Sequence, residues 1–187
     1  MIKGTTRKRT FRAIYRLLDQ VSPVPFDCGR ICGAACCHAD GLPEMGMFLL
    51  PGEDKIHQKT DDWLSWEMLD TDLYDFPPSW QGKVCFVNCQ GPEHCKRALR
   101  PIQCRTFPLK PVFLKADETP PGLVFRGKEG LALIYSDDEL PYACPLITSQ
   151  ARLDPAFIRA TYTVWKHLIR DPLIYDYIKE EGTISPD

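Results

Sequence analysis

Hydrophobic residues recur at helical spacing near both ends of the chain. In residues 6–20 the apolar positions fall on one face of a helix, and two prolines follow its expected end. This face consists of Phe11, Ile14, Tyr15 and Leu18. An Asp-Pro pair at 154–155 has the cap and first-turn pattern of a second amphipathic helix, and another at 171–172 predicts a last short helix ending near Gly182. The pattern therefore predicts helices at both ends of the chain.

Between these helices, β-branched and aromatic residues gather in short runs. Three runs predict strands at residues 112–114, 123–125 and 131–135. The sequence RGKEG between the last two is typical of a hairpin loop, so we expect a small antiparallel sheet. Residues 47–50 predict another short strand. Cys85 lies in the run VCFV, which predicts a buried strand and an ordinary core role for this thiol.

One further segment, TDDWLSWEML, predicts a short helix from Asp61, with Trp63, Trp66 and Leu69 on one face. With 187 residues, 44% of them hydrophobic, the chain can bury one sizeable core. We therefore expect a single domain over residues 1–187 with an α+β fold. It should contain a small antiparallel sheet, N- and C-terminal helices, and cysteine-rich metal-binding loops.

Charge and hydropathy narrow the range of partners. The 23 basic and 25 acidic residues give a formal net charge of -2, so nucleic-acid binding through an overall basic field has no support. Charged residues such as Arg12 and Arg16 interrupt the apolar residues of the first segment, which excludes a signal-peptide core. No run approaches the roughly 18 apolar residues of a membrane span. We expect a cytoplasmic protein that has a redox or protein partner, not yet known, and no membrane partner.

The nine cysteines carry the chemistry of this sequence. The stretch CGRICGAACC, residues 28–37, holds four of them, and a second cysteine-rich region, broken by prolines, runs over residues 83–111. In a reducing cytosol such clusters bind metal more often than they form disulfides. Thiolates are ligands of zinc and of iron–sulfur clusters, whereas calcium and magnesium prefer oxygen. The spacing departs from the commonest zinc and ferredoxin patterns, so it predicts a metal without deciding which.

Several neighbouring residues leave alternatives open. The adjacent Cys36 and Cys37 point in different directions if the chain is extended, so we expect them to serve different centres or to bracket one cluster. His38 and His94 stand next to cysteines, and either is able to replace a thiolate at a zinc site. Glu53 is interpreted as a first-turn helix acid that needs no chemical role.

Four sequence elements resemble the YkgJ-type cysteine-cluster family, a family of proposed zinc- or iron-chelating proteins. They are CGRICGAACC, GMFLLPGED, NCQGPEHCKRALRPIQCRTFPLKP and YACPL, and together they span roughly residues 26–146. By this resemblance the metal ligands are Cys28, Cys32, Cys36, Cys37, Cys89, Cys95, Cys104 and Cys144. Cys85 has no counterpart. The first two cysteines are separated by three residues, where many members of the family have two, so we infer a sub-branch.

Eight thiols fit two four-thiolate centres, or one cluster with spare redox-active thiols. Each four-thiolate zinc centre would carry a charge of -2, so cations among the cysteines, chiefly Arg100 and Arg105, are expected to bind the cofactor. An equal alternative is that Arg105 only bridges structural carbonyl groups and that the loop charges are solvated. Because a structural zinc site needs only four ligands, an iron–sulfur cluster, such as a [4Fe–4S] cluster, stands ahead of zinc. We expect electron transfer, or an accessory role in a redox or modification system.

Three alternatives remain open. A structural zinc module would use its metal-held loops to bind another protein. A second alternative is an enzyme, because the family that the chain resembles includes flagellin lysine methylases. The sequence has no glycine motif for S-adenosylmethionine, so it leaves enzymatic activity undecided. Thiol–disulfide chemistry would require an exposed thiol of low pKa beside a cation, for which Cys95 next to Lys96 is the best candidate.

Overall fold

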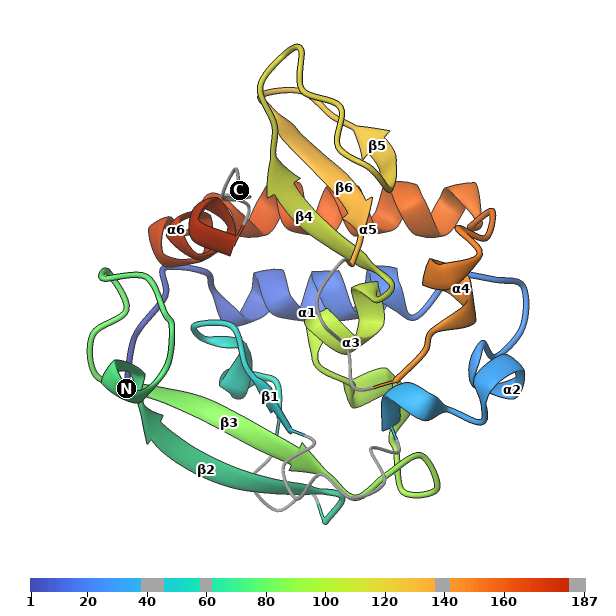
Figure 1. The fold of residues 1–187 in the computed structure, drawn as a ribbon. Coiled ribbons are helices and arrows are strands. Elements are labelled where there is room, and N and C mark those ends of the chain that lie inside the picture. The colour runs from blue at the N-terminus through green and yellow to red at the C-terminus, as the bar shows by residue number, and fades with distance from the viewer. Residues whose placement is uncertain (38–45, 58–61, 137–141, 182–187) are drawn as a thin grey trace.

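Helices and two small antiparallel sheets give the chain an α+β fold, as the sequence predicted (Figure 1). The computed structural model describes residues 1–37, 46–57, 62–136 and 142–181. Its helices are α1 (Lys8–Leu18), α2 (Gly29–Cys32), α3 (Ile102–Thr106), α4 (Pro145–Thr148), α5 (Pro155–Leu168) and α6 (Pro172–Glu181). Short 3-10 turns lie at η1 (Ala35–Cys37), η2 (Glu53–Lys55), η3 (Thr71–Leu73) and η4 (Arg97–Leu99). The predicted helices near the two ends of the chain are thus confirmed as α1, α5 and α6.

The first sheet contains β1 (Gly46–Phe48), β2 (Leu64–Asp70) and β3 (Lys83–Cys89), in the order β1-β3-β2. The helix predicted from Asp61 was wrong, because this segment forms strand β2. It pairs with β3 in antiparallel register from Leu64 opposite Cys89 to Asp70 opposite Lys83. Cross-strand pairing along this whole length outweighs the helical spacing of the two tryptophans, which in a ten-residue run does not distinguish helix from strand.

The second sheet contains β4 (Leu109–Phe113), β5 (Leu123–Arg126) and β6 (Leu131–Tyr135), in the order β4-β6-β5. The hairpin predicted around RGKEG is confirmed, because β5 and β6 pair in antiparallel register. The central strand β6 is buried from Leu131 to Ile134, which explains its continuous apolar run. Strand β4 begins three residues earlier than its β-rich sequence predicted.

The main core lies where α1, α5 and the second sheet pack together. Helix α1 contributes the four apolar residues that its sequence predicted, and all four are buried. Helix α5 contributes Phe157, Val164, Trp165 and Leu168 to the same cluster, and β6 adds Leu131 and Leu133. Each large side chain buried in this way stabilises the fold by roughly 1.5–3 kcal/mol. This core also includes Ile102 of α3 and Cys144, while α2 lies to the lower right of it in Figure 1.

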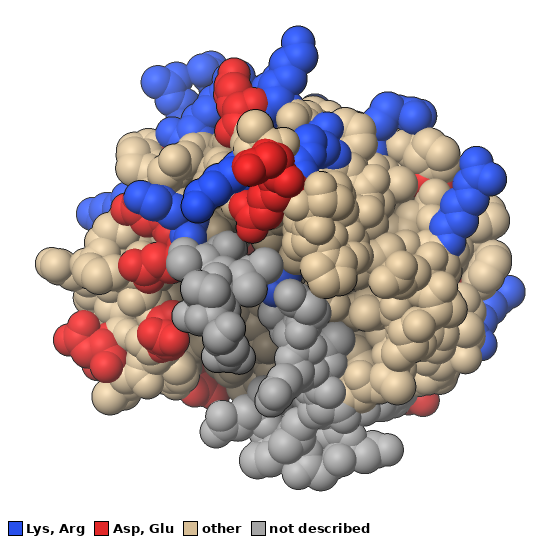
Figure 2. Space-filling model, turned by 45° about the horizontal axis from the view of Figure 1, so that its top comes forward, with Lys and Arg blue, Asp and Glu red and all other residues tan. Residues whose placement is uncertain are grey.

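The described surface carries both signs of charge. On the face drawn in Figure 2, Lys and Arg side chains lie near Asp and Glu, beside a broad area without charges. Within the described ranges, every helix falls short of the length and apolar character that a membrane span requires.

Candidate metal centre

The first cysteine cluster is shaped by a reversal of the chain between two short helical turns. Cys28 precedes α2 and Cys32 ends it. Gly33 and Ala34 then adopt left-handed conformations, with φ of 61° and 58°, and lead the chain into the turn η1. A left-handed residue ends a helix readily, and glycine adopts this conformation without steric cost. The reversal lets four cysteines within ten residues line one bend.

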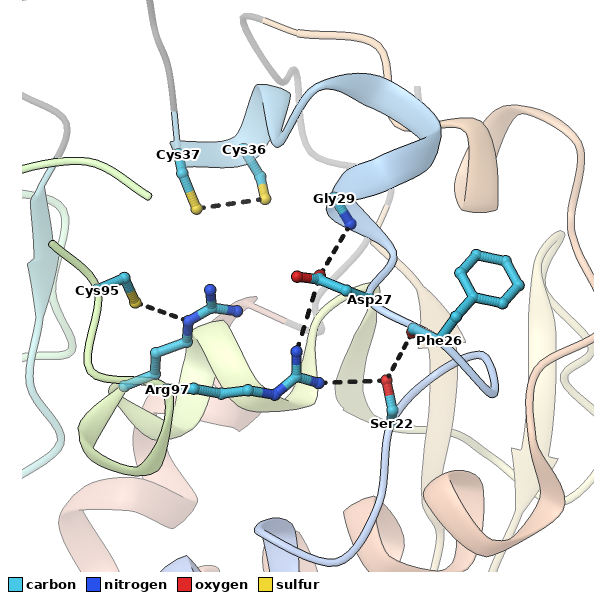
Figure 3. Close-up of polar contacts among 9 residues, drawn as sticks. Ser22, Phe26, Asp27, Gly29, Cys36, Cys37, Cys95 and Arg97 are labelled. Carbon is cyan, nitrogen blue, oxygen red and sulfur yellow. Dashed lines mark hydrogen bonds and ion pairs between the residues drawn. The ribbon is translucent and has the colours of Figure 1, made fainter. Parts of the chain in front are cut away.

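Polar contacts fasten this bend to the second cysteine-rich region. Asp27 Oδ1 accepts a hydrogen bond of 3.1 Å from the backbone N–H of Gly29, at the start of α2. The Arg97 guanidinium lies 3.7 Å from the same carboxylate and donates a 3.3 Å hydrogen bond to Ser22 Oγ (Figure 3). Arg97 belongs to η4, so these contacts join segments about 70 residues apart in sequence.

Cys36 and Cys37 lie side by side. Their Sγ atoms are 3.9 Å apart and point the same way, since η1 is a helical turn and not the extended chain assumed from the sequence (Figure 3). Hydrogen bonding from the Cys36 thiol lowers the pKa of Cys37 to about 7 and raises the pKa of Cys36. Cys37 therefore holds much of its population as thiolate near neutral pH.

The second region contributes three more thiols. Cys89 ends β3, Cys95 follows the Gly-Pro turn, and Cys104 lies in α3. The Nε–H of Arg100 donates a 2.8 Å hydrogen bond to Cys95 Sγ. Hydrogen bonding from Cys89, together with this guanidinium, lowers the pKa of Cys95 to about 6. A second thiolate is thus favoured beside a cation.

The fold brings these two regions together. The Arg100 guanidinium interacts electrostatically with Cys95, Cys37 and Cys104. Cys36, Cys37 and Cys95 face the same space in Figure 3, although they lie nearly 60 residues apart in sequence. Cys104 Sγ in turn lies 3.6 Å from Met47 Sδ.

Cys144 joins the first cluster from a third segment. It occupies the N-cap position of α4 and is buried. Four cysteines together line a cavity of about 30 Å³, which has room for about one water molecule. They are Cys28, Cys32, Cys36 and Cys144. The remaining walls are largely apolar and include Ile31, Phe107 and Leu146.

Cys85 behaves as the sequence predicted. It is buried in β3 and packs in a separate core cluster with Leu49, Trp63 and Val87. Its position in the first sheet gives it the role of a core residue.

The two arginines expected at the cofactor differ in position. Arg100 donates to a cysteine sulfur, as described above. Arg105 donates instead to the carbonyl oxygen of Ala98, at 3.0 Å, and to the carboxylate of Asp19. Its guanidinium also lies 5.1 Å from the ring centre of Tyr15. Arg105 therefore fastens α3 to α1, and its described contacts include no sulfur atom.

Glu53 has a role that the sequence did not reveal. Its side chain is buried, and Oε1 accepts hydrogen bonds of 2.7 Å from both the Tyr15 hydroxyl and the backbone N–H of Ile102. Oε2 accepts a third bond, of 3.1 Å, from the backbone N–H of Leu50. Glu53 thus ties η2 to α1 and to the first residue of α3, the helix that carries Cys104. Only the position of an acid after a Pro-Gly turn hinted at this role.

The histidines add little to the site. His57 is buried, with Nε2 3.1 Å from the Tyr15 hydroxyl. His94 lies in the turn before Cys95, and no described contact joins it to a sulfur. His38, the other residue expected as an alternative ligand, lies outside the described residues.

The donor set fits a thiophilic metal by its chemistry. It contains only thiols, and Cys37 and Cys95 have pKa values lowered toward neutrality. In the described part of the chain, no three Cys, His, Asp or Glu side chains are already grouped closely enough to hold a metal ion. Metal binding therefore requires side-chain movement within the loops. Comparisons with models of protein families, with curated proteins and with solved structures find no match to this chain.

Proposed function

We propose that this protein is a metal-binding cysteine-cluster protein of the YkgJ type that carries an iron–sulfur cluster. One observation supports this most strongly. Segments 40 or more residues apart in sequence bring thiols near one another, because Cys28, Cys32, Cys36 and Cys144 line one cavity and Arg100 interacts with Cys37, Cys95 and Cys104, while Cys85 packs in a separate core cluster. Free cysteines that only fill core space have no need to be gathered in this way.

Each group of residues has a distinct task in this proposal. The thiols of the two regions and Cys144 would hold the metal, and Arg100 would neutralise part of the thiolate charge through its N–H donors. The apolar walls around Cys144 limit the access of water to the sulfurs on that side. When bound, an iron–sulfur cluster supplies one-electron transfer, so the protein would act in electron transfer or as an accessory to a redox or modification system. Reduced thiols also favour a cytoplasmic location.

A structural zinc module is the second candidate. Cys144 joins the main core through α4, so a metal bound there would fasten loops to the scaffold. In that case the function would lie in a protein-binding surface formed by the metal-held loops.

The first experiment is purification without oxygen, followed by measurement of iron, acid-labile sulfide and zinc per chain and of the visible spectrum. We expect iron with matching sulfide and a broad brown absorbance. Cys95→Ser should lower the iron content, while Cys85→Ala, the matched control, should retain it. Zinc alone in whole-number ratio would support the structural module, and stoichiometric absence of both metals would refute the proposal.

A further inference from the structure

We infer that the eight thiols form two separate metal centres and that the boundary between them runs between Cys36 and Cys37. This inference rests on the proposed function, since it assigns the ligands of that metal site. The cavity-side set is Cys28, Cys32, Cys36 and Cys144. The arginine-side set is Cys37, Cys89, Cys95 and Cys104.

The cavity-side set shares one enclosed space. All four of its side chains line the cavity of about 30 Å³ between α2, η1 and the start of α4. The thiol of Cys28 also interacts electrostatically with those of Cys32 and Cys144. A cavity bounded by four thiols and apolar groups has the donor number of a closed four-thiolate centre.

The arginine-side set shares one cation. Cys95 accepts a hydrogen bond from Arg100, and the same guanidinium interacts with Cys37 and Cys104. Cys89 interacts electrostatically with Cys95. No member of this set lines the cavity. A thiolate centre here would therefore have the charged N–H donors of Arg100 beside it. The described residues that line the cavity include no such donor.

The adjacent pair marks the boundary. The two Sγ atoms lie 3.9 Å apart, so each residue can belong to a different centre only if the two centres adjoin. The lining of the cavity distinguishes the pair, because Cys36 lines it with Cys28 whereas Cys37 does not and interacts electrostatically with Arg100 and Cys95. Two consecutive residues would thus place the centres next to each other.

The test compares two variants that differ by one position. Cys36→Ser and Cys37→Ser, purified without oxygen, are assayed for metal per chain and then alkylated, with the labelled peptides identified by mass spectrometry. Each variant should lose about half of the wild-type metal. In Cys37→Ser the arginine-side thiols should become reactive while Cys28 and Cys144 stay protected, and Cys36→Ser should give the reverse pattern.

Double variants give a second readout, in which the metal content of each double variant is compared with that of its two single variants. Cys32→Ser combined with Cys144→Ser should lose no more metal than either change alone, whereas Cys32→Ser combined with Cys104→Ser should lose all of it. Complete loss of metal in every single variant, with all thiols reactive, would overturn the two-centre assignment and indicate one shared cluster. Wild-type protein that binds no metal would instead refute the proposed function itself, so the two failures are distinguishable.

Discussion

The contact from Cys89 and the hydrogen bond from Arg100 both favour the thiolate form of Cys95. A guanidinium N–H to thiolate contact at 2.8 Å is charge-assisted, and it favours the deprotonated sulfur that a metal requires. The low pKa of Cys95, about 6, therefore means that few protons need to be displaced at this position at neutral pH.

Arg100→Gln should raise the pKa of Cys95 toward the ordinary thiol value of about 8.5, because the positive charge is lost. In the metal-free wild-type protein, the rate of alkylation of Cys95 by iodoacetamide should rise with pH with a midpoint near 6. The variant should move this midpoint to higher pH. Arg105→Gln is the control, since Arg105 contacts Ala98 and Asp19 and should leave the profile unchanged. An equal shift in both variants would contradict the assignment.

Sequence reasoning could place Cys85 in the core but could not separate the two arginines. The run VCFV carried enough apolar character to predict burial, and the structure agrees. Arg100 and Arg105 are equally plausible as sulfur partners in sequence, because both stand among the cysteines. The structure separates them because the orientation of α3 places the Arg105 side chain against Tyr15 of α1. A sequence pattern does not predict this orientation.

Among the secondary-structure elements, η2 is stabilised by a buried acid and α5 by an exposed cap. Asp154 Oδ1 accepts a 2.6 Å hydrogen bond from the backbone N–H of Ala156, so the helix start predicted from the Asp-Pro pair has its cap in place. Glu53, in contrast, serves three separate segments at once.

Asp154→Ala should lower the free energy of unfolding by about 1 kcal/mol, because the first turn of α5 loses its acceptor. Urea denaturation measures this change, and metal content should stay at the wild-type level since no described contact of Asp154 involves a sulfur. Asp154→Asn retains an acceptor and should stay within a few tenths of a kcal/mol of wild type. A loss of metal in the alanine variant would contradict this separation of scaffold and site.

Glu53→Gln should lower the free energy of unfolding by about 1–3 kcal/mol, because one amide oxygen replaces two carboxylate acceptors and the buried donors of Tyr15, Leu50 and Ile102 compete for it. Asp54→Asn, at the next position of the same turn, is the matched control and should change stability by less than about 0.5 kcal/mol. Similar losses in both variants, measured by urea denaturation, would show that burial of Glu53 does not matter.

For strand β2, the sequence pattern alone does not distinguish a strand from a helix. Its apolar residues fit a helical face as well as a strand, and only the partner strand β3, contributed from a later part of the chain, decides between them. Helix α5 has 14 residues and the start signal of an Asp-Pro pair, so it could be predicted from its sequence alone.

At the scale of the whole molecule, different interactions stabilise the apolar core and the cysteine-rich turns. The main core relies on α1, α5 and the second sheet, whereas most of the proposed ligands lie on short turns with few buried neighbours. Removal of metal by a chelator should therefore loosen the edge and leave the core folded.

Hydrogen exchange measured by mass spectrometry checks this expectation. After chelation, amides in residues 28–37 and 89–104 should exchange at least tenfold faster, while those of α1 and α5 should keep their protection. Cys85→Ala supplies the control, because it should lose about 1 kcal/mol of stability and still show the metal-dependent protection of both loops. Loss of protection throughout the chain would mean that the scaffold itself depends on metal.

The position of Cys144 at the N-cap of α4 also orders events during translation. The last arginine-side ligand, Cys104, leaves the ribosome 40 residues before Cys144 (144 − 104), which at 5–20 residues per second is about 2–8 s earlier. Three thiols of the cavity-side set thus leave the ribosome at least 108 residues before the fourth, Cys144 (144 − 36). Metal supplied during synthesis would therefore meet the arginine-side set complete while the cavity-side set still lacks Cys144.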